Sequence, residues 1–191
     1  MRVGVLGGTF DPVHLGHIFL AKEVIKKLVL DKVIFMPAAS APLRQEKVSA
    51  PGEDRYQMLK FATGDSVNFE VSRFEIDKGG ISFTVDTLEA LKGSLQKEDE
   101  LFFIAGSDVN CELSRWKDFD KICKLAGFIL VKRPDFQSSD CPKGVITVDI
   151  NALDISSSKI RKLIRSNRSY DKFVSDKVYR YIKEKGLYKN V

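Results

Sequence analysis

The first 37 residues place a helical segment between two apolar ones. Residues 1–8, MRVGVLGG, predict a short buried strand that runs into a glycine turn, and residues 32–37, KVIFMP, predict a second strand. Between them, Leu20, Val24 and Leu28 recur every four residues among lysine and glutamate, which is typical of an amphipathic helix. The strands of such a strand–helix–strand unit are almost always parallel, so we expect an α/β protein.

The rest of the chain continues the alternation. Apolar runs predict strands over residues 67–76, 100–108, 127–135 and 144–150, and helical spacing predicts helices over residues 53–63, 81–95, 116–126, 156–166 and 175–186. This order predicts a doubly wound parallel sheet, Rossmann-like, with a small helical C-terminal part. We expect one domain over residues 1–191, with residues 151–191 as a C-terminal helical subregion.

Charge is concentrated at the C-terminal end. Residues 151–191 contain 11 lysines and arginines against 4 acidic residues, a net charge of +7 in a chain of +5. Such a segment could contact nucleic acid, a membrane surface or a polyphosphate, or simply be a solvated helical face. No apolar run approaches the roughly 20 residues needed to cross a bilayer, and no secretion signal is evident. The three cysteines are widely spaced and form no CxxC pair, so a cytoplasmic protein without a disulfide framework is expected.

Residues 7–17, GGTFDPVHLGH, contain both histidines of the chain. Gly7 and Gly8 allow a sharp turn and the close approach of a ligand, and the start of the following helix offers N–H groups that suit phosphate. The segment is neither a GxGxxG fingerprint nor a P-loop, which disfavours hydride-transferring dinucleotide enzymes and P-loop kinases. His14 and His17 lie on one side of a helix start. They could make only local hydrogen bonds, bind a metal, or donate to phosphate oxygens in phosphoryl or nucleotidyl transfer.

Residues 155–164, ISSSKIRKLI, are the second candidate for anion binding. Ser156 is a suitable N-cap, and the helix that follows carries Arg161 one turn further on. One interpretation is a capped, amphipathic, basic helix with no ligand. The other is a second polyanion site, so that the two segments would hold a triphosphate between them.

The two segments together resemble the (H/T)xGH and (I/V)SSxxIR signatures of a nucleotidyltransferase superfamily. RYQML, GISFTVDTLEAL, FIAGSD, VKRP and VSDKVYRYIKEKGLY further resemble, in order and almost end to end, segments of the bacterial nicotinate-nucleotide adenylyltransferases. The resemblance implies adenylyl transfer from ATP to nicotinate mononucleotide, giving deamido-NAD and pyrophosphate in NAD biosynthesis. The alternative is the same chemistry on nicotinamide mononucleotide or phosphopantetheine.

The resemblance also implies residue roles. His14 and His17 would donate to the ATP phosphates, and with Arg161 they are the implied catalytic residues. Ser156, Ser157 and Arg161 would hold the β and γ phosphates, and Gly106 and Asp108 the adenosine ribose. The full set implied to bind ATP is Gly7, Gly8, Thr9, Phe10, His14, His17, Gly106, Asp108, Ser156, Ser157 and Arg161, and the set implied to bind the acceptor is Thr84, Trp116, Arg44 and Arg133.

Some of these assignments have a structural alternative. Trp116 is either a core aromatic or an indole stacked on the pyridine ring, and Thr84 could offer its backbone N–H to the nicotinate carboxylate. The family commonly has a Pro-Pro-His-Lys-like run where this chain has residues 41–44, Ala-Pro-Leu-Arg, so Arg44 could supply the cation. Arg133 and Arg55 are either ligands of the substrate or members of structural ion pairs.

The expected partners are ATP, with Mg²⁺ bound to it rather than to a protein metal site, and nicotinate mononucleotide. Neither nucleic acid nor a membrane is expected as a partner, and the oligomeric state is left open, a homodimer included. An RNA-binding module is the alternative from a different class. In it, aromatic side chains beside basic residues would stack on bases, although their helical spacing is more typical of a core; these are Tyr170, Phe173, Tyr179 and Tyr181.

Overall fold

The structure is a computed structural model that describes residues 1–42, 49–64, 66–106, 113, 115–132, 142, 144–150 and 153–189. The elements in chain order are β1 (Arg2–Gly8), α1 (Leu15–Leu28), β2 (Lys32–Pro37), α2 (Gly52–Thr63), β3 (Phe69–Val71), α3 (Phe74–Lys78), α4 (Thr84–Ser94), β4 (Glu100–Gly106), α5 (Phe119–Leu125), β5 (Gly127–Lys132), β6 (Val145–Asp149), α6 (Ser157–Arg165), the 3₁₀ turn η2 (Asp171–Phe173) and α7 (Asp176–Lys185).

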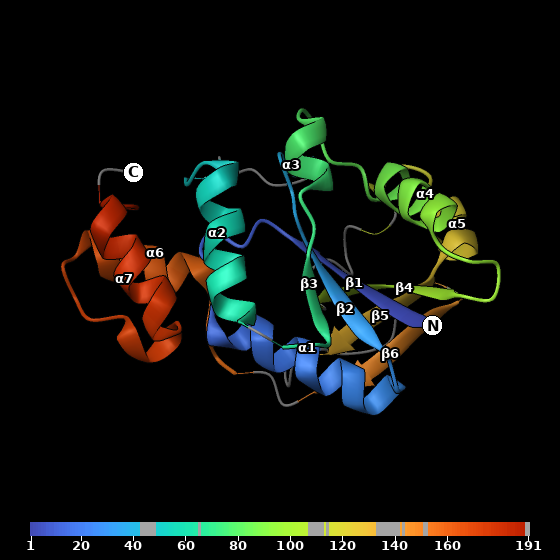
Figure 1. The fold of residues 1–191 in the computed structure, drawn as a ribbon, viewed down its shortest axis with the longest axis horizontal. Helices are drawn as coiled ribbons and strands as arrows, with labels where there is room; N and C mark the ends of the chain where they lie inside the picture. Colours follow the sequence, from blue (N-terminus) through green and yellow to red (C-terminus); the bar gives the residue numbers. More distant parts are fainter. Residues whose placement is uncertain are drawn as a thin grey trace.

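The described strands form one six-stranded sheet in the order β3-β2-β1-β4-β5-β6 (Figure 1). Every neighbouring pair in it is parallel. This confirms the predicted doubly wound fold. The chain runs outward from β1 to one edge through β2 and β3, and then returns to the other side of β1 through β4. Ligands of such sheets bind beyond the carboxyl ends of the strands at this reversal, between β1 and β4.

Side chains that alternate along the strands build a core on each face of the sheet. On β1, Val3 and Val5 belong to a cluster with Val85 and Leu88 of α4 and with Ile122 of α5. The other face is covered by α1, α2, α6 and α7, whose buried side chains share a second cluster. Figure 1 shows α6 and α7 together at one end of the molecule, beside α2. The described helices include none that is both long and apolar enough to span a membrane.

The prediction of one strand over residues 67–76 was wrong. The strand pairing ends at Val71, opposite Phe35 of β2. The hydroxyl of Ser72 then accepts a hydrogen bond from the backbone N–H of Phe74, at 3.2 Å, where the short helix α3 begins. A serine that bonds to the main chain two residues on favours a helix start over a strand, and alternating hydrophobicity does not reveal this.

The C-terminal helices begin and end where the sequence indicates. The hydroxyl of Ser156 accepts from the backbone N–H of Lys159 at 3.2 Å, and Gly186 ends α7 with a φ of 63°. The four aromatic residues of this region are packed: Tyr170 is buried, the other three lie against the core, and the rings of Tyr170 and Tyr179 are 4.9 Å apart. Their helical spacing therefore marks core packing, as the structural interpretation had it.

Candidate active site

The turn after β1 is buried and tightly packed. A β-carbon built on Gly7 would lie 2.9 Å from Cζ of Phe103, and one built on Gly8 would lie 3.2 Å from Cζ of Phe10. The prediction that these two glycines form the turn was wrong, because both belong to β1 and pair with β2, and they make room there for aromatic rings. Phe10 itself has a φ of 49°, in the left-handed region, and only 2% of it is exposed. Phe10 is therefore almost inaccessible as a whole, and its implied contact with ATP stays a prediction.

The two histidines cap the start of α1 together. His14 is the N-cap, and its backbone N–H donates to Nδ1 of His17 at 3.2 Å, while the side chain of His14 faces the backbone of His17 in return. The two imidazole rings stack, with centroids 3.7 Å apart and an angle of 25° between planes. A β-carbon on Gly16 would lie 3.0 Å from Nδ1 of His14, so the glycine between them leaves space for this arrangement. The structure thus places both imidazoles side by side at a helix N-terminus.

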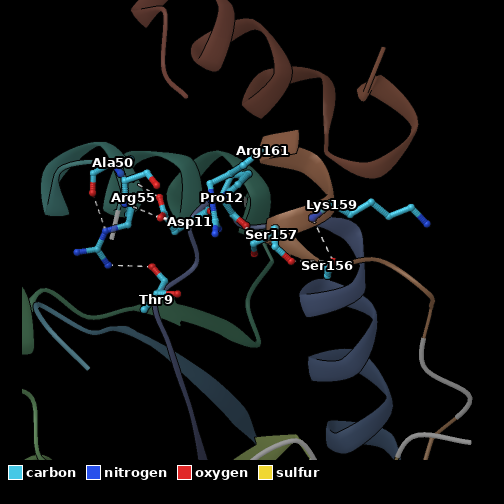
Figure 2. Close-up of polar contacts among 11 residues, drawn as sticks. Thr9, Asp11, Pro12, Ala50, Arg55, Ser156, Ser157, Lys159 and Arg161 are labelled. Atoms are coloured by element: carbon cyan, nitrogen blue, oxygen red, sulfur yellow. Dashed lines mark hydrogen bonds and ion pairs between the residues drawn. The ribbon is translucent and has the colours of Figure 1, made fainter. Parts of the chain in front are cut away.

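The start of α6 lies against this turn, although 150 residues separate Arg161 from Asp11. Nη1 of Arg161 donates to the main-chain oxygen of Asp11 at 2.8 Å, and the hydroxyl of Ser157 donates to the main-chain oxygen of Pro12 at 2.9 Å (Figure 2). Nη1 of Arg161 is also 4.0 Å from the Asp11 carboxylate. The expectation that the two signature segments converge is confirmed.

Arg161 is buried, whereas a cation on the solvated face of an amphipathic helix would be exposed. Its exposed fraction is 8%, whereas Lys159 on the same helix is exposed. The guanidinium contacts the turn, and the hydroxyl of Ser156 accepts a hydrogen bond at the helix N-terminus, so hydrogen bonds already position these side chains, which the resemblance implies hold phosphate.

Two buried charged residues, one in the turn and one on α2, have structural roles that the sequence did not predict. The Asp11 carboxylate accepts from the backbone N–H groups of Ser49, at 2.7 Å, and Ala50, at 3.0 Å. Arg55, 2% exposed, had been considered as a substrate ligand or an ion-pair member, but it hydrogen-bonds main-chain carbonyls instead. The aspartate inside GGTFDP was the available sequence signal for the first. Nothing in RYQML indicated the second.

Tyr188, near the end of the chain, is buried in the same region. It belongs to the core cluster that includes Phe10, and 3% of it is exposed. Burial raises the pKa of its hydroxyl, and the neighbouring negative charge of Asp11 raises it further. The C-terminal segment therefore closes the side of the core nearest to the turn.

The two described candidates for the acceptor, Thr84 and Trp116, lie on the other face of the sheet. Thr84 is the first residue of α4, and Trp116 is half-buried, with its ring 5.8 Å from that of Phe103 and edge to face with it. Lys117 next to it lies 3.3 Å from the carboxylate of Asp86 in the first turn of α4, which holds the two segments together. Trp116 thus contributes to the core, and its stacking on a pyridine ring stays a prediction.

Three further candidates, Arg44, Asp108 and Arg133, lie outside the described residues. Gly106 is described, as the last residue of β4, next to the reversal of the sheet. Within the described ranges, no group of three or more His, Cys, Asp or Glu side chains is arranged to hold a metal ion.

Comparison with known proteins agrees with this geometry. Residues 5–163 match the family model described as cytidylyltransferase-like. A protein of Clostridium botulinum named probable nicotinate-nucleotide adenylyltransferase is 37% identical over 199 residues, which cover 98% of both chains. A protein of Thermus thermophilus with the same name is 39% identical over 190 residues, covering 99% of this chain and 100% of the relative.

Among solved structures, nicotinic acid mononucleotide adenylyltransferase of Plasmodium falciparum, complexed with NaAD, has a TM-score of 0.80 at 20% identity. The match covers 98% of this chain and 97% of the other, and it shows that the fold is shared. With a family model over most of the chain and full-length relatives at this identity, the chain belongs to the nicotinate-nucleotide adenylyltransferase family of cytidylyltransferase-like proteins.

Proposed function

We propose that this protein transfers the adenylyl group of ATP to nicotinate mononucleotide, giving deamido-NAD and pyrophosphate. The observation that carries the proposal is the contact of Arg161 and Ser157 with the turn at Asp11 and Pro12. It brings two helix N-termini, one with paired histidines and one with serines and an arginine, to a single place. Such an arrangement suits a polyphosphate. The relatives' printed names and the NaAD complex of the structural neighbour support the same activity.

The reaction needs positioning more than proton transfer. An oxygen of the mononucleotide's 5′-phosphate attacks the α-phosphorus of ATP in line, the new P–O bond forms, and the bond to pyrophosphate breaks. The attacking phosphate is already anionic at neutral pH, so no general base is required. Transfer of this kind is accelerated chiefly by holding the reactants together and by stabilising the charge that shifts to the leaving group.

The hydrogen bond within the histidine pair fixes which ring atom of His17 can act. Its Nδ1 accepts from the His14 backbone N–H, so the neutral ring carries its proton on Nε2. That Nε2–H is the donor we assign to the ATP phosphates. His14, stacked on His17, would donate beside it, and Ser156, Ser157 and Arg161 would hold the β and γ phosphates.

We assign Mg²⁺ to the ATP phosphates. Asp11, the acidic residue of the turn, accepts hydrogen bonds from two backbone N–H groups and lies beside Arg161, an environment that suits a structural carboxylate better than a metal ligand. Mg²⁺ commonly keeps several waters and binds through substrate phosphates, where it would neutralise charge on the leaving pyrophosphate. The protein side chains then need only to orient the phosphates.

The acceptor would lie toward α4 and Trp116. The first N–H groups of a helix lack partners within it and favour an anion, so the N-terminus of α4 at Thr84 suits the nicotinate carboxylate. The indole of Trp116 would stack on the pyridine ring from the segment that Lys117 ties to α4. Arg44 and Arg133 would add positive charge around the mononucleotide, and Gly106 and Asp108 would contact the adenosine ribose.

A pyrophosphate-release assay with ATP, Mg²⁺ and a panel of acceptors tests the proposal. The panel contains nicotinate mononucleotide, nicotinamide mononucleotide and phosphopantetheine. We expect the highest kcat/KM with the nicotinate nucleotide. Faster release with phosphopantetheine would contradict the assignment of the acceptor, and release with none of the three would contradict the proposed activity.

A further inference from the structure

Arg55 of α2 is a buried arginine whose guanidinium binds main-chain carbonyls. Its side chain is almost completely buried, and burial lowers its pKa. The three hydrogen bonds that the structure gives it all run to main-chain oxygens: from Nη1 to Thr9 at 2.8 Å, from Nη1 to Ala38 at 2.7 Å and from Nε to Ala50 at 3.1 Å. Transfer of a guanidinium from water to the protein interior is unfavourable, so a hydrophobic side chain would fill this space at a lower desolvation cost.

The three carbonyls belong to three different segments at the carboxyl end of the sheet. Thr9 follows β1, Ala38 follows β2, and Ala50 precedes α2. Figure 2 shows the guanidinium between Thr9 and Ala50. One side chain therefore ties the turn after β1 to the segments on both sides of the β2–α2 connection. An ammonium or an apolar group cannot reproduce this, because the planar fork offers several donors in fixed directions.

Asp11 holds the same connection from the opposite side. Ala50 donates its N–H to Asp11 and accepts from Arg55 through its carbonyl oxygen. The main chain at Ala50 is thus bonded at both of its polar groups, by residues that act on the same turn. The negative charge of Asp11 also partly offsets the burial of Arg55.

Three main-chain carbonyls of the turn face protein donors. Arg55 binds that of Thr9, Arg161 that of Asp11 and Ser157 that of Pro12. In a trans peptide the N–H points opposite to the preceding carbonyl, and the described cis bond lies elsewhere, between Asp11 and Pro12. The carbonyl of Thr9 is directed to Arg55, so the N–H of Phe10 is directed away from it.

From this geometry we infer that Arg55 is a positioning residue for nucleotide transfer. It fixes the orientation of the Thr9–Phe10 peptide and the distance between the turn and the β2–α2 connection, without touching either substrate. The inference rests on the proposed function, because the turn is the segment that would meet ATP. A displacement of about 1 Å in such a segment can reduce the rate on the order of 100-fold.

Two substitutions separate this role from simple filling of the core. Arg55→Lys keeps the charge beside Asp11 and loses the fork, and Arg55→Met keeps much of the volume and loses the charge. Met58→Ala is the matched control, because Met58 is completely buried one turn further along α2 and belongs to the core cluster that includes Phe10. Its truncation removes buried apolar volume and should lower the Tm, but it removes none of the hydrogen bonds to the turn.

The kinetic test measures pyrophosphate release from folded protein, at a temperature where circular dichroism shows each variant to be native. We expect kcat to fall at least tenfold in Arg55→Lys and further in Arg55→Met, with a smaller change in the KM for ATP, and to stay within twofold of the original in Met58→Ala. If Arg55→Met does not fold, the kcat of Arg55→Lys alone tests the inference. Full kcat in folded Arg55→Lys, or an equal loss in Met58→Ala, would overturn the inference.

Hydrogen exchange supplies a readout that does not depend on the activity. We expect faster amide exchange at residues 8–13 and 49–50 in Arg55→Lys than in the original protein, and no such change at these positions in Met58→Ala. Unchanged exchange in the lysine variant overturns the inference even if the original protein proves to act on another acceptor. Pyrophosphate release with none of the acceptors contradicts the proposed function, and the exchange comparison still decides whether Arg55 fixes the turn.

Discussion

His17 has two functions that substitution can separate. Its Nδ1 accepts the backbone N–H of His14 at the start of α1, and its Nε2–H is the proposed phosphate donor. The first contributes to stability, by about 0.5–1.5 kcal/mol for a hydrogen bond of this type. In a chain of 191 residues that corresponds to a Tm change of about 2–4 °C per kcal/mol. The donation from Nε2 should raise kcat by a factor of about 10²–10³, as single donors to a reacting centre typically do.

Three variants assign these contributions. His17→Ala loses both, so we expect a lower Tm and a loss of kcat of about 10²–10³. His17→Asn places a carbonyl oxygen near the position of Nδ1 and nothing at Nε2, so it should keep most of the Tm and lose the rate. His17→Gln can place an amide N–H near Nε2, so it should recover part of the rate without the cap.

The assay is pyrophosphate release with ATP and nicotinate mononucleotide at saturation, together with thermal unfolding followed by circular dichroism. Near-normal turnover of His17→Ala would refute the assignment of the donor. A drop in Tm for His17→Asn as large as that for His17→Ala would refute the capping role of Nδ1.

Three further predictions follow from the same geometry. Arg161→Ala should raise the KM for ATP more than that for the mononucleotide, because the guanidinium is assigned to the β and γ phosphates; steady-state kinetics with each substrate varied checks this, and the reverse pattern would exchange the subsites. Glu75 is buried, and desolvation raises the pKa of its carboxyl in the folded protein. The folded protein therefore binds this proton more tightly than the unfolded chain does, and the stability falls as the pH rises from the ordinary pKa through the raised value. Glu75→Gln, which can still accept from the Thr87 hydroxyl, should therefore gain stability relative to the original protein between pH 4.5 and 7.5 in urea titrations, and an unchanged difference would contradict this. Trp116 is the single tryptophan, so nicotinate mononucleotide should quench its fluorescence and Trp116→Ala should raise the KM for the mononucleotide, whereas a normal KM in that variant would leave the indole with its core role alone.

Local sequence patterns predicted most of the fold because hydrophobic periodicity is a local property. The strand–helix–strand unit at the N-terminus and the caps at Ser156 and Gly186 are each readable within a few residues. The exception at residues 67–76 has a local cause too, a serine hydroxyl that starts a helix inside an alternating pattern. A single hydrogen bond outweighed a periodicity that spans only a few residues on an edge strand.

The two segments that we propose to bind phosphate were recognisable from residue types, since glycines, paired histidines, serines and arginine before or within a helix start are each suited to anions. Their meeting was an expectation that only the folded chain could confirm. Arg161 reaches the turn after β1 because α6 packs on the face that also carries α1 and α2. That placement depends on the whole core, and no local pattern contains it.

The sequence by itself determined the alternation of strands and helices and the doubly wound class, and it pointed to two segments suited to phosphate, because each follows from spacing and residue chemistry along the chain. Only the tertiary structure decided that Asp11 and Arg55 join the turn to the segment at Ala50, and that Gly7 and Gly8 admit aromatic rings. A buried donor can satisfy any carbonyl within reach, and which carbonyl lies within reach is set by the packing of residues far apart in the chain.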